Sequence, residues 1–416
     1  MEAQNTYSYW RQLIRTFRAR RINSWAWRGL LLLVFVAVFG DFLANEKPLY
    51  CQREGQTSFP VLQDYAIQLG WAQADAAYFN TRWSELDYEA VLFPPIPYSA
   101  STFDRSNMQL TSPFGVQEVP SWRWRHWLGT DELGRDVAAG LVAGTRTALK
   151  GGLIAMSLAT LIGLFLGTLA GYFGDDGLRL RALSVVLFLL ILPVLGFYAL
   201  VVDDDVLPLG GGLWFGFFVL IGGGLATFGL GRLLSNGLRL RKTWTIPLDQ
   251  LIMRLVEVIN SLPGLLLILA LLAILPRPGI SYLMVIIGLI SWTSIARYIR
   301  AALLKIRQLD YMLAGKALGY SHFRLIGRHA LPNGIRPVLI ALSFGMAGAV
   351  LLEAFLSFLG IGLPADAVTW GTLIRKIQAN ATTGAWWLAL FPGMAIFFTV
   401  TIFNLIGEGL TRAMGE

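Results

Sequence analysis

The sequence predicts an all-α protein that crosses a membrane several times. The chain has 416 residues, 55% of them hydrophobic, and its mean hydropathy is +0.57. This is more apolar side chain than the core of a soluble domain encloses. Several apolar runs approach or exceed the roughly 20 residues that cross the hydrocarbon layer. Because every backbone group in lipid must be bonded within its own segment, we expect these runs to be helices.

The apolar runs define about eight membrane spans by their length. The predicted spans are residues 25–43, 148–173, 183–202, 213–234, 251–275, 282–299, 335–359 and 386–410. Arginines precede the first run, which is longer than a signal-peptide core and lacks a cleavage site of small residues, so we expect it to remain uncleaved. The even number of spans and the basic tail place both termini in the cytoplasm.

The spans divide the chain into segments of different character. These segments are a cytoplasmic amino-terminal tail at 1–25, a first transmembrane helix at 26–45, an extracytoplasmic insert at 46–125 and a transmembrane domain at 126–416. The insert is acidic and aromatic, which fits the outer side of the membrane. Residues 179–236 form a predicted hairpin with basic flanks and the tip Asp203-Asp204-Asp205. A solvated turn explains that tip more simply than a cation site, which is the alternative.

Composition excludes several classes of function. The net charge of +8 gathers in loops that should face the cytoplasm, so it does not require nucleic acid as a partner. The single Cys51 allows no internal disulfide, and the three histidines are too scattered to predict a metal site. The sequence has no G-x-x-x-x-G-K-[ST] phosphate loop and no Ser-His or Cys-His arrangement. We therefore expect neither an enzyme nor a chain that hydrolyses ATP itself.

Small and charged residues inside the spans have separate explanations. Gly163, Gly167 and Gly171 recur every fourth residue, which predicts a stripe where a second helix approaches closely. Glu257 and Glu353 lie in or near apolar spans, where a central charge costs roughly 2.5 to 3.5 kcal/mol. We expect both carboxyl groups to have hydrogen-bonding partners and a structural role. The alternative is an ion-gradient-driven secondary transporter in which Glu257, Asn260 and Glu353 hold an ion beside a helix broken at Pro263-Gly264.

Residues 310–333, DYMLAGKALGYSHFRLIGRHALPN, form a basic amphipathic segment between two apolar runs. Ala314 is followed five residues later by Gly319, and Leu331-Pro332-Asn333 ends the predicted helix. This spacing resembles the EAA loop of ABC importer permeases, a short cytoplasmic helix that docks on the ATP-hydrolysing subunit. The resemblance assigns ATPase docking to Leu313, Ala314, Gly315, Lys316, Ala317, Leu318, Gly319, Leu331 and Pro332.

The docking segment departs from that family pattern at two positions. Leu313 stands at the usual Glu, and Gly315 stands at the second Ala. The missing carboxylate removes one polar contact with an ATPase, but the small residues still permit close approach, so we expect coupling to be retained. Gly315 costs the helix up to about 1 kcal/mol relative to Ala. The basic residues Lys316, Arg324 and Arg328 are predicted to face either the ATPase or lipid headgroups.

A second pattern, HWLGTDELGRDV, starts at His126 and is followed by Gly144, Arg146 and Leu149. It resembles the HPLGTDxxGRDV sequence in the C-type subunit of oligopeptide and dipeptide (peptide/nickel) ABC importer permeases. EAFLSFLG at 353–360, Trp370-Gly371 and residues 387–392 resemble the ending of the same subunits. The resemblance gives a signature at the outer face: Gly129, Thr130, Asp131, Gly134, Arg135 and Asp136.

This resemblance implies a permease subunit in the cytoplasmic (inner) membrane that moves peptides by alternating access. Its fold would be a six-helix type I ABC importer core, with the hairpin 179–236 inserted and the EAA-type loop at 310–333. Its partners would be a second permease subunit, two ABC ATPase subunits, an extracytoplasmic substrate-binding protein, peptide and membrane lipid. ATP and Mg would be held by the ATPases, so this chain itself would bind no cofactor. Nickel, glutathione and peptide antibiotics are the alternative cargoes.

Overall fold

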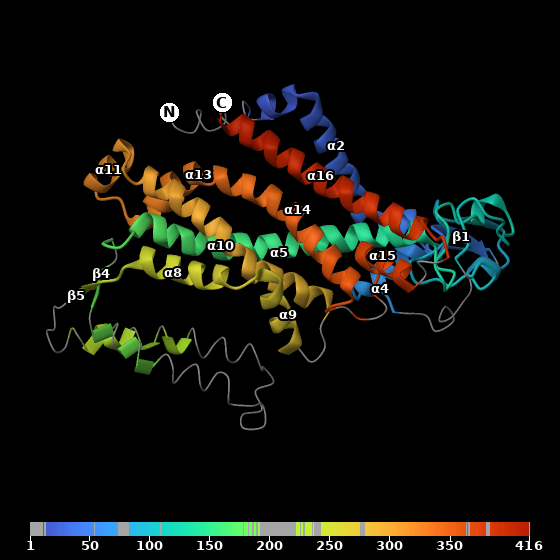
Figure 1. Cartoon of the computed structure of the whole chain (residues 1–416), viewed down its shortest axis with the longest axis horizontal. Helices are drawn as coiled ribbons and strands as arrows, with labels where there is room; N and C mark the ends of the chain where they lie inside the picture. The colour runs from blue at the N-terminus through green and yellow to red at the C-terminus, as the bar shows by residue number, and fades with distance from the viewer. Residues whose placement is uncertain are drawn as a thin grey trace. The chain divides into compact units, whose positions relative to one another are not determined.

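The computed structural model (Figure 1) describes most of the chain. The described residues are 14–53, 55–73, 83–108, 110–177, 243–274, 279–362, 367–379 and 383–415, with residues 11, 179–181, 183–184, 187–188, 190–191, 222–224, 226–227, 229–234, 236 and 364. The predicted spans 183–202 and 213–234 therefore lie partly outside the described residues, and the Asp203-Asp204-Asp205 tip lies wholly outside them.

The chain forms two compact units. The first unit comprises Met1–Leu164, Ile259–Tyr298 and Gly334–Glu416, and the second comprises Phe165–Val258 and Ile299–Asn333. The helices α5 (Val137–Phe173) and α10 (Ile280–Ile306) each pass from one unit into the other. Each unit is described by itself below.

Five helices in the described part of the chain are long and apolar enough to cross a membrane. They are α2 (Arg21–Val38), α5, α10, α14 (Arg336–Leu359) and α16 (Trp387–Gly415). A sixth span results if α8 (Leu248–Ser261) and α9 (Gly264–Ile274) are counted as one. These two helices occupy the predicted span 251–275, which is broken at Pro263 because proline cannot continue the backbone ladder. The fold is thus mostly helical, with five or six candidate spans among these residues.

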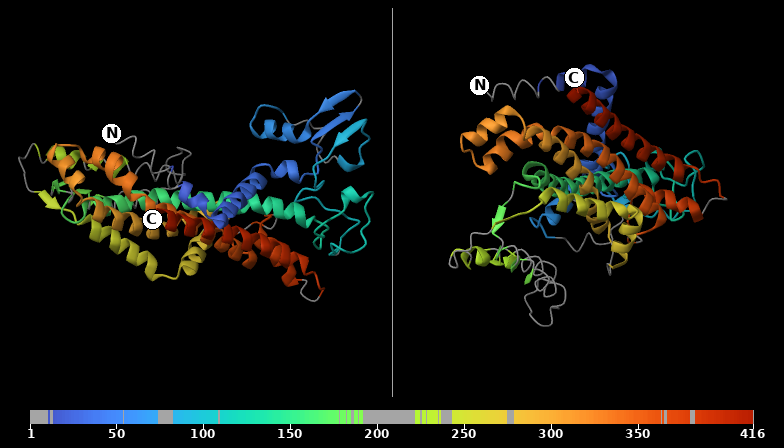
Figure 2. Two further views of the ribbon diagram at one scale, coloured as in Figure 1. Left: turned by 90° about the horizontal axis from the view of Figure 1, so that it is seen from above. Right: turned by 60° about the vertical axis from the view of Figure 1, so that its left-hand side comes forward.

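In the first unit, α14 packs on α16 and on α15 (Trp370–Ala379), and α16 also packs on α2 (Figures 1 and 2). Trp370 is 1% exposed and lies over Gly144 of α5, where an added Cβ would be 2.4 Å from the indole Cδ1. Gly163 likewise lies against α10, because a Cβ there would be 2.7 Å from the carbonyl oxygen of Trp292. The predicted close approach of a second helix is confirmed at this glycine.

The helix α5 begins at Val137, earlier than the predicted start at residue 148. The prediction stopped short because Arg146 interrupts the apolar run. Arg146 donates from Nη1 and Nη2 to the two carboxylate oxygens of Asp41, at 3.0 and 2.9 Å. Asp41 lies on the short helix α3 (Gly40–Leu43), so this ion pair joins the end of the first span to α5.

The insert corrects the all-α prediction. Residues of β1 (Tyr50–Arg53) pair with β2 (Gln56–Ser58) and β3 (Ala90–Leu92) in an antiparallel sheet of order β2-β1-β3. Alternation over three or four residues is too short to be recognised in a polar, aromatic stretch. The sheet buries Cys51 against Trp83 and Phe93. The remaining elements are α4 (Pro60–Gln68), η2 (Trp83–Glu85) and η3 (Trp122–Trp124).

The second unit contains the end of α5, α8, the end of α10 and the segment 310–333. The strands β4 (Arg179–Arg181) and β5 (Thr243–Thr245) pair antiparallel. Arg300 of α10 donates from Nη2 to Asp249 of α8 at 2.6 Å. Gly171 of α5 lies against α10, where an added Cβ would be 2.8 Å from the Arg300 carbonyl oxygen. The segment 310–333 folds as α11 (Asp310–Ala317), α12 (His322–Leu325), the π-helical turn η4 (Ile326–Ala330) and α13 (Leu331–Gly334).

Candidate functional site

The helix α11 ends in a closed, well-defined cap. Gly319 has φ of 76°, a left-handed conformation that costs glycine little. Its N–H donates to the Lys316 carbonyl at 3.0 Å, and the Tyr320 N–H donates to the Gly315 carbonyl at 3.0 Å. These two bonds form a Schellman motif, which satisfies carbonyls that the helix end leaves free. The Gly319 of the predicted docking motif is therefore the residue that stops the helix and turns the chain.

Gly315 lies where α11 packs against α12. Met312 and Gly315 are buried on one face of α11, and Leu325 is 1% exposed. An added Cβ at Gly315 would be 2.7 Å from Cδ2 of Leu325. Ser321 starts α12 by accepting a hydrogen bond from the Arg324 N–H at 3.3 Å. The departure from Ala at position 315 thus has a packing reason, because Leu325 occupies the space of the missing methyl group.

Three large apolar side chains of this segment are exposed. Leu313, Leu318 and Phe323 have exposed fractions of 50%, 72% and 90%. Ala314, Lys316 and Ala317 are exposed beside them. We call Leu313, Leu318 and Phe323 the exposed ridge. Large exposed apolar side chains on neighbouring turns of one short segment are candidates for contact with another protein or with lipid.

The carboxyl end of the segment differs from the prediction. Leu331-Pro332-Asn333 was expected to end the helix, but helical turns continue through α13 to Gly334. The Leu331 N–H donates to the Ile326 carbonyl, five residues back, and so closes the π-helical turn. Pro332 follows in the first turn of α13, where its missing N–H breaks no helical bond. Asn333 donates from Nδ2 to the His329 carbonyl at 2.7 Å.

The signature at 129–136 forms a tight loop at the start of α5. Oδ1 of Asp131 accepts hydrogen bonds from the N–H groups of Leu133 and Arg135, at 2.9 and 2.8 Å. Its Oδ2 accepts from Nζ of Lys376 on α15 at 2.5 Å. Asp136 caps α5, because its Oδ1 accepts from the Ala139 N–H at 2.7 Å. Both aspartates are buried, and their carboxylates are hydrogen-bonded within the fold.

His126 lies between two carboxylates beneath this loop and is fully buried. Its Nδ1 is 2.8 Å from Oδ2 of Asp136, and its Nε2 is 3.1 Å from Oδ2 of Asp104. The ring stacks on Tyr98 with centroids 4.2 Å apart. Burial alone would lower the pKa of His126, but the hydrogen bonds and charges of Asp136 and then Asp104 outweigh it, so the pKa is raised. Burial would raise the pKa of Asp104, but bonds from Asn107 and His126 hold it below the usual value.

Gly129, Thr130 and Gly134 allow chain segments to pass very closely. An added Cβ at Gly134 would be 2.1 Å from the Asp104 carbonyl oxygen, and one at Gly129 would be 2.7 Å from that of Thr111. Both glycines have positive φ, at 75° and 79°. Thr130 donates from Oγ1 to the Asn107 carbonyl at 2.9 Å, and its own carbonyl accepts from the Trp387 indole at 3.0 Å.

Arg135 completes the signature loop. Its guanidinium carbon lies 4.7 Å from the ring centroid of Phe103. The structure therefore brings all six signature residues together in one loop. This loop joins the start of α5 to α15 and α16.

The two glutamates in or near apolar spans each have a side-chain partner. Oε1 of Glu353 accepts a hydrogen bond from Ser357 Oγ at 2.6 Å, and Glu353 is 1% exposed. Glu257 pairs with Arg254 at 2.8 Å on an exposed face of α8. Asn260 accepts from Thr293 Oγ1 at 3.2 Å. The described residues contain no cluster of three or more His, Cys, Asp or Glu side chains that could hold a metal ion.

Comparison with known proteins assigns the family. Residues 246–415, which include the whole segment 310–333, match the family described as the binding-protein-dependent transport system inner membrane component. The chain is a binding-protein-dependent transport permease. The dipeptide transport system permease protein DppC of Bacillus subtilis is 29% identical over 289 residues, covering 70% of this chain and 68% of DppC. The peptidoglycan transport system permease protein YejE of Agrobacterium fabrum is 25% identical over 424 aligned positions, covering 96% of this chain and 91% of YejE.

The permease is thus a multi-pass inner-membrane component of ABC transport and not its catalytic component. Permeases of this type work with ATPases and a binding protein. The resemblance that the motifs predicted is confirmed at this level.

The permease uses several residues that the motifs did not single out. Lys376 and Trp387 reach the signature loop from α15 and α16, more than 240 residues away in the sequence. Asp104 joins His126 from the insert. His126 was discounted because the three histidines are far apart in sequence, yet its partners are carboxylates and not other histidines. The Asp-rich loop beside a histidine was the available signal.

Proposed function

We propose that this permease moves peptides across the inner membrane by alternating access, powered by two separate ABC ATPase subunits that hold ATP and Mg. A second permease subunit completes the pathway, and an extracytoplasmic binding protein delivers the cargo. The relatives support this cargo by their names, since one is a dipeptide permease and the other a peptidoglycan permease. Fragments of peptidoglycan contain short peptides, so the two names point to related chemistry.

We also propose the topology in which both termini lie in the cytoplasm. The six-helix type I core would be formed by the candidate spans of the described residues together with the bent pair α8 and α9. The hairpin 179–236 would add two spans, for about eight in all. The insert 46–125 would then face the binding protein. The outer signature loop would hold α5, α15 and α16 together on that side.

The observation that carries the proposal is the exposed ridge on the capped segment 310–333. Leu313, Leu318 and Phe323 expose apolar surface while Met312, Gly315 and Leu325 fix the two helices to each other. The Schellman cap at Gly319 prevents α11 from fraying at its end. A rigid surface with apolar side chains is suited to transmit motion from an ATPase, because packed elements move as bodies.

The test is ATP hydrolysis by the reconstituted transporter in proteoliposomes, with and without loaded binding protein. Leu318→Glu places a charge on the exposed ridge, and we expect the stimulated ATPase rate to fall by about tenfold, since a desolvated charge in an interface costs several kcal/mol. Trp244→Glu is the matched control, because Trp244 is 42% exposed on β5, outside both the segment 310–333 and the insert. Equal losses in both variants would refute docking at the ridge.

The power source and the cargo are tested in the same vesicles. Uptake of a labelled dipeptide and of a labelled muropeptide is measured with ATP inside and no ion gradient. We expect ATP-dependent uptake of at least one of them. Uptake that ignores ATP and follows an imposed proton or sodium gradient would replace the proposal with the secondary-transporter alternative.

A further inference from the structure

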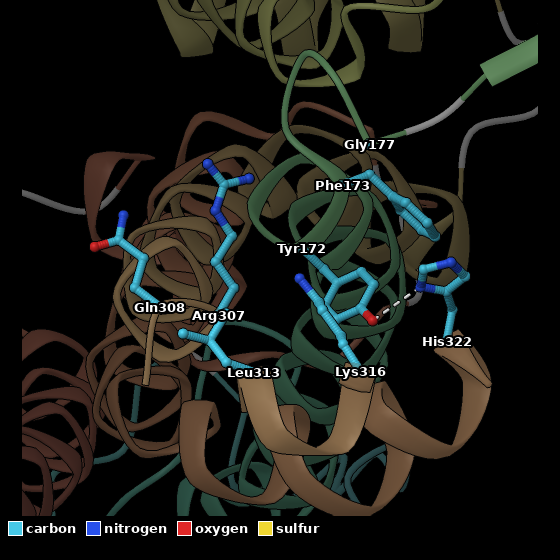
Figure 3. A pocket seen from close by; sticks show the side chains of 8 residues that line it. All are labelled: Tyr172, Phe173, Gly177, Arg307, Gln308, Leu313, Lys316 and His322. Carbon is cyan, nitrogen blue, oxygen red and sulfur yellow. Dashed lines mark hydrogen bonds between the residues drawn. The ribbon is translucent and has the colours of Figure 1, made fainter. Parts of the chain in front are cut away.

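A pocket of about 360 Å³ opens in the second unit between the end of α5, the end of α10 and the segment 310–333 (Figure 3). Its lining residues are Tyr172, Phe173, Gly177, Arg307, Gln308, Leu313, Lys316 and His322. Figure 3 shows these side chains around one space, with Arg307 and Lys316 coming from different elements. The volume is in the range of small-ligand sites.

The described lining of this pocket carries positive charge and contains no carboxylate. Among the described residues that line it, Arg307 and Lys316 carry positive charge, and none is Asp or Glu. Leu313 lies in the lining at the position where the docking motif usually has Glu. A carboxylate at that position would lie in the same lining as both cations. With Leu313 there, the pocket offers two cations and one apolar wall to a ligand from outside the chain.

Contacts within the chain hold the lining residues in place without a ligand. The Tyr172 hydroxyl is 3.0 Å from Nδ1 of His322, and this bond joins α5 to α12. Nζ of Lys316 lies 5.7 Å from the centroid of the Tyr172 ring, which holds the ammonium group at the pocket wall. Gly174 has φ of 62°, and an added Cβ there would be 2.4 Å from a guanidinium nitrogen of Arg307. Gly174 therefore leaves the space in which the Arg307 side chain lies.

The sequence places this pocket at the edge of the hydrocarbon layer. Residues 151–173 of α5 contain no charged side chain. At about 1.5 Å per residue, that length crosses a hydrocarbon core of about 30 Å. Tyr172 and Phe173 end the uncharged stretch, and aromatic rings at such ends lie at headgroup level. A ligand that reaches this pocket from the membrane would present its headgroup to Arg307 and Lys316.

We propose that this pocket binds the phosphate of an anionic phospholipid headgroup, so that a lipid joins the docking segment to the ends of α5 and α10. Arg307 presents a planar fork that suits phosphate oxygens, and Lys316 supplies a point charge. Phe173 covers the glycerol and the first carbons of the chains, and Leu313 forms the wall between the pocket and the rest of the exposed ridge. The lipid then links two span ends to the surface on which the proposed ATPase docks.

The experiment uses the purified full chain, delipidated in detergent and without ATPase subunits. Native mass spectrometry measures retained phosphatidylglycerol, with phosphatidylcholine as the zwitterionic comparison. We expect phosphatidylglycerol to be retained selectively. The double variant Arg307→Gln/Lys316→Gln should retain it about thirtyfold more weakly, since the two basic groups contribute about 1 kcal/mol each. Leu313→Glu should weaken retention too, by placing a carboxylate in the lining.

The matched control is Arg324→Gln/Arg328→Gln, which removes the same charge from the same segment at residues that do not line the pocket. Equal loss in the control would overturn the proposal in favour of general surface attraction. Displacement of the lipid by inorganic phosphate at low concentration would show a site for free phosphate and also overturn it. Unchanged lipid retention in the pocket variant would overturn the proposal as well, because the two cations would then not hold the lipid. Because the lipid measurement contains no ATPase, its result does not depend on whether the proposed docking function is correct.

Discussion

The signature loop at 126–136 buries polar side chains, whereas the docking segment at 310–333 exposes apolar ones. In the loop, polar side chains are buried and each makes several bonds, as Asp131 does with two backbone N–H groups and Lys376. In the docking segment, apolar side chains are exposed and the bonds are those of helix caps. The two motifs therefore have different roles. One stabilises the chain internally, and the other leaves a surface for something outside it.

The glycines test this difference most directly. Gly134 and Gly319 have nearly equal φ, at 75° and 76°. A Cβ at Gly134 would be 2.1 Å from a backbone oxygen, whereas a Cβ at Gly319 would meet nothing within 4 Å. We expect Gly134→Ala to lower the free energy of unfolding by about 4 kcal/mol through strain and overpacking, and Gly319→Ala by about 1 to 2 kcal/mol through strain alone.

Denaturant unfolding of the purified permease in detergent measures both losses. Gly319→Asn is the control, since Asn adopts the left-handed region more readily than Ala. Similar losses for Gly134→Ala and Gly319→Ala would remove the distinction between a packed loop and an open one.

The ion pair between Asp131 and Lys376 is expected to give the next largest effect. Asp131→Asn leaves the ammonium group without its carboxylate in a partly buried position, and it should cost about 2 to 3 kcal/mol. A double-mutant cycle with Lys376→Met isolates the pairwise contribution, because the methionine keeps the length of the side chain. A coupling energy near zero would mean that the backbone bonds of Asp131 alone stabilise the loop.

The pH dependence of the loop follows from His126. Its folded pKa is raised above the unfolded value near 6.5, so its contribution to stability is fully present below that value. The contribution is lost as the pH rises through the folded pKa. Unfolding free energies of the wild-type permease should therefore fall above neutral pH, and His126→Gln should flatten this slope. A slope that persists in the variant would assign it to other groups.

The smallest change in stability is expected on the exposed ridge. Phe323 is 90% exposed, so Phe323→Ser should alter the free energy of unfolding by less than about 0.5 kcal/mol. The same variant should reduce co-purification of the ATPase subunits with the permease. A large loss of stability would show that Phe323 packs within the chain in the membrane, and the contrast with the loop would then be weaker.

Much of the helical layout follows from the apolar runs because lipid leaves the backbone few alternatives. The predicted spans at 282–299, 335–359 and 386–410 correspond to α10, α14 and α16. The start of α5 was missed because Arg146 interrupts its run, and the ion pair with Asp41 on a distant helix is not visible in local sequence. The small sheet of the insert was missed because strands of three or four residues have little periodicity.

The candidate sites were predictable to different degrees. Gly319 and the six signature residues were found from their motifs, because these residue types have few physical substitutes at such positions. Lys376 and Asp104 were not found, and Trp387 was placed in a separate motif without its contact to the loop, since each reaches the loop from a remote element. The pocket at Arg307 depends on where α5 and α10 end in space, which no spacing along the chain specifies.

The bidentate contact between Arg146 and Asp41 has a consequence for biosynthesis. The two residues are 105 positions apart, so the ribosome needs about 5 to 20 s at 5–20 residues per second to supply the guanidinium after the carboxylate. In the proposed topology, the leading helix would reside in the bilayer during that interval with its acidic end hydrated at the outer surface. The contact would then close only after translocation of the whole intervening polypeptide, and so it would record that the insert has crossed.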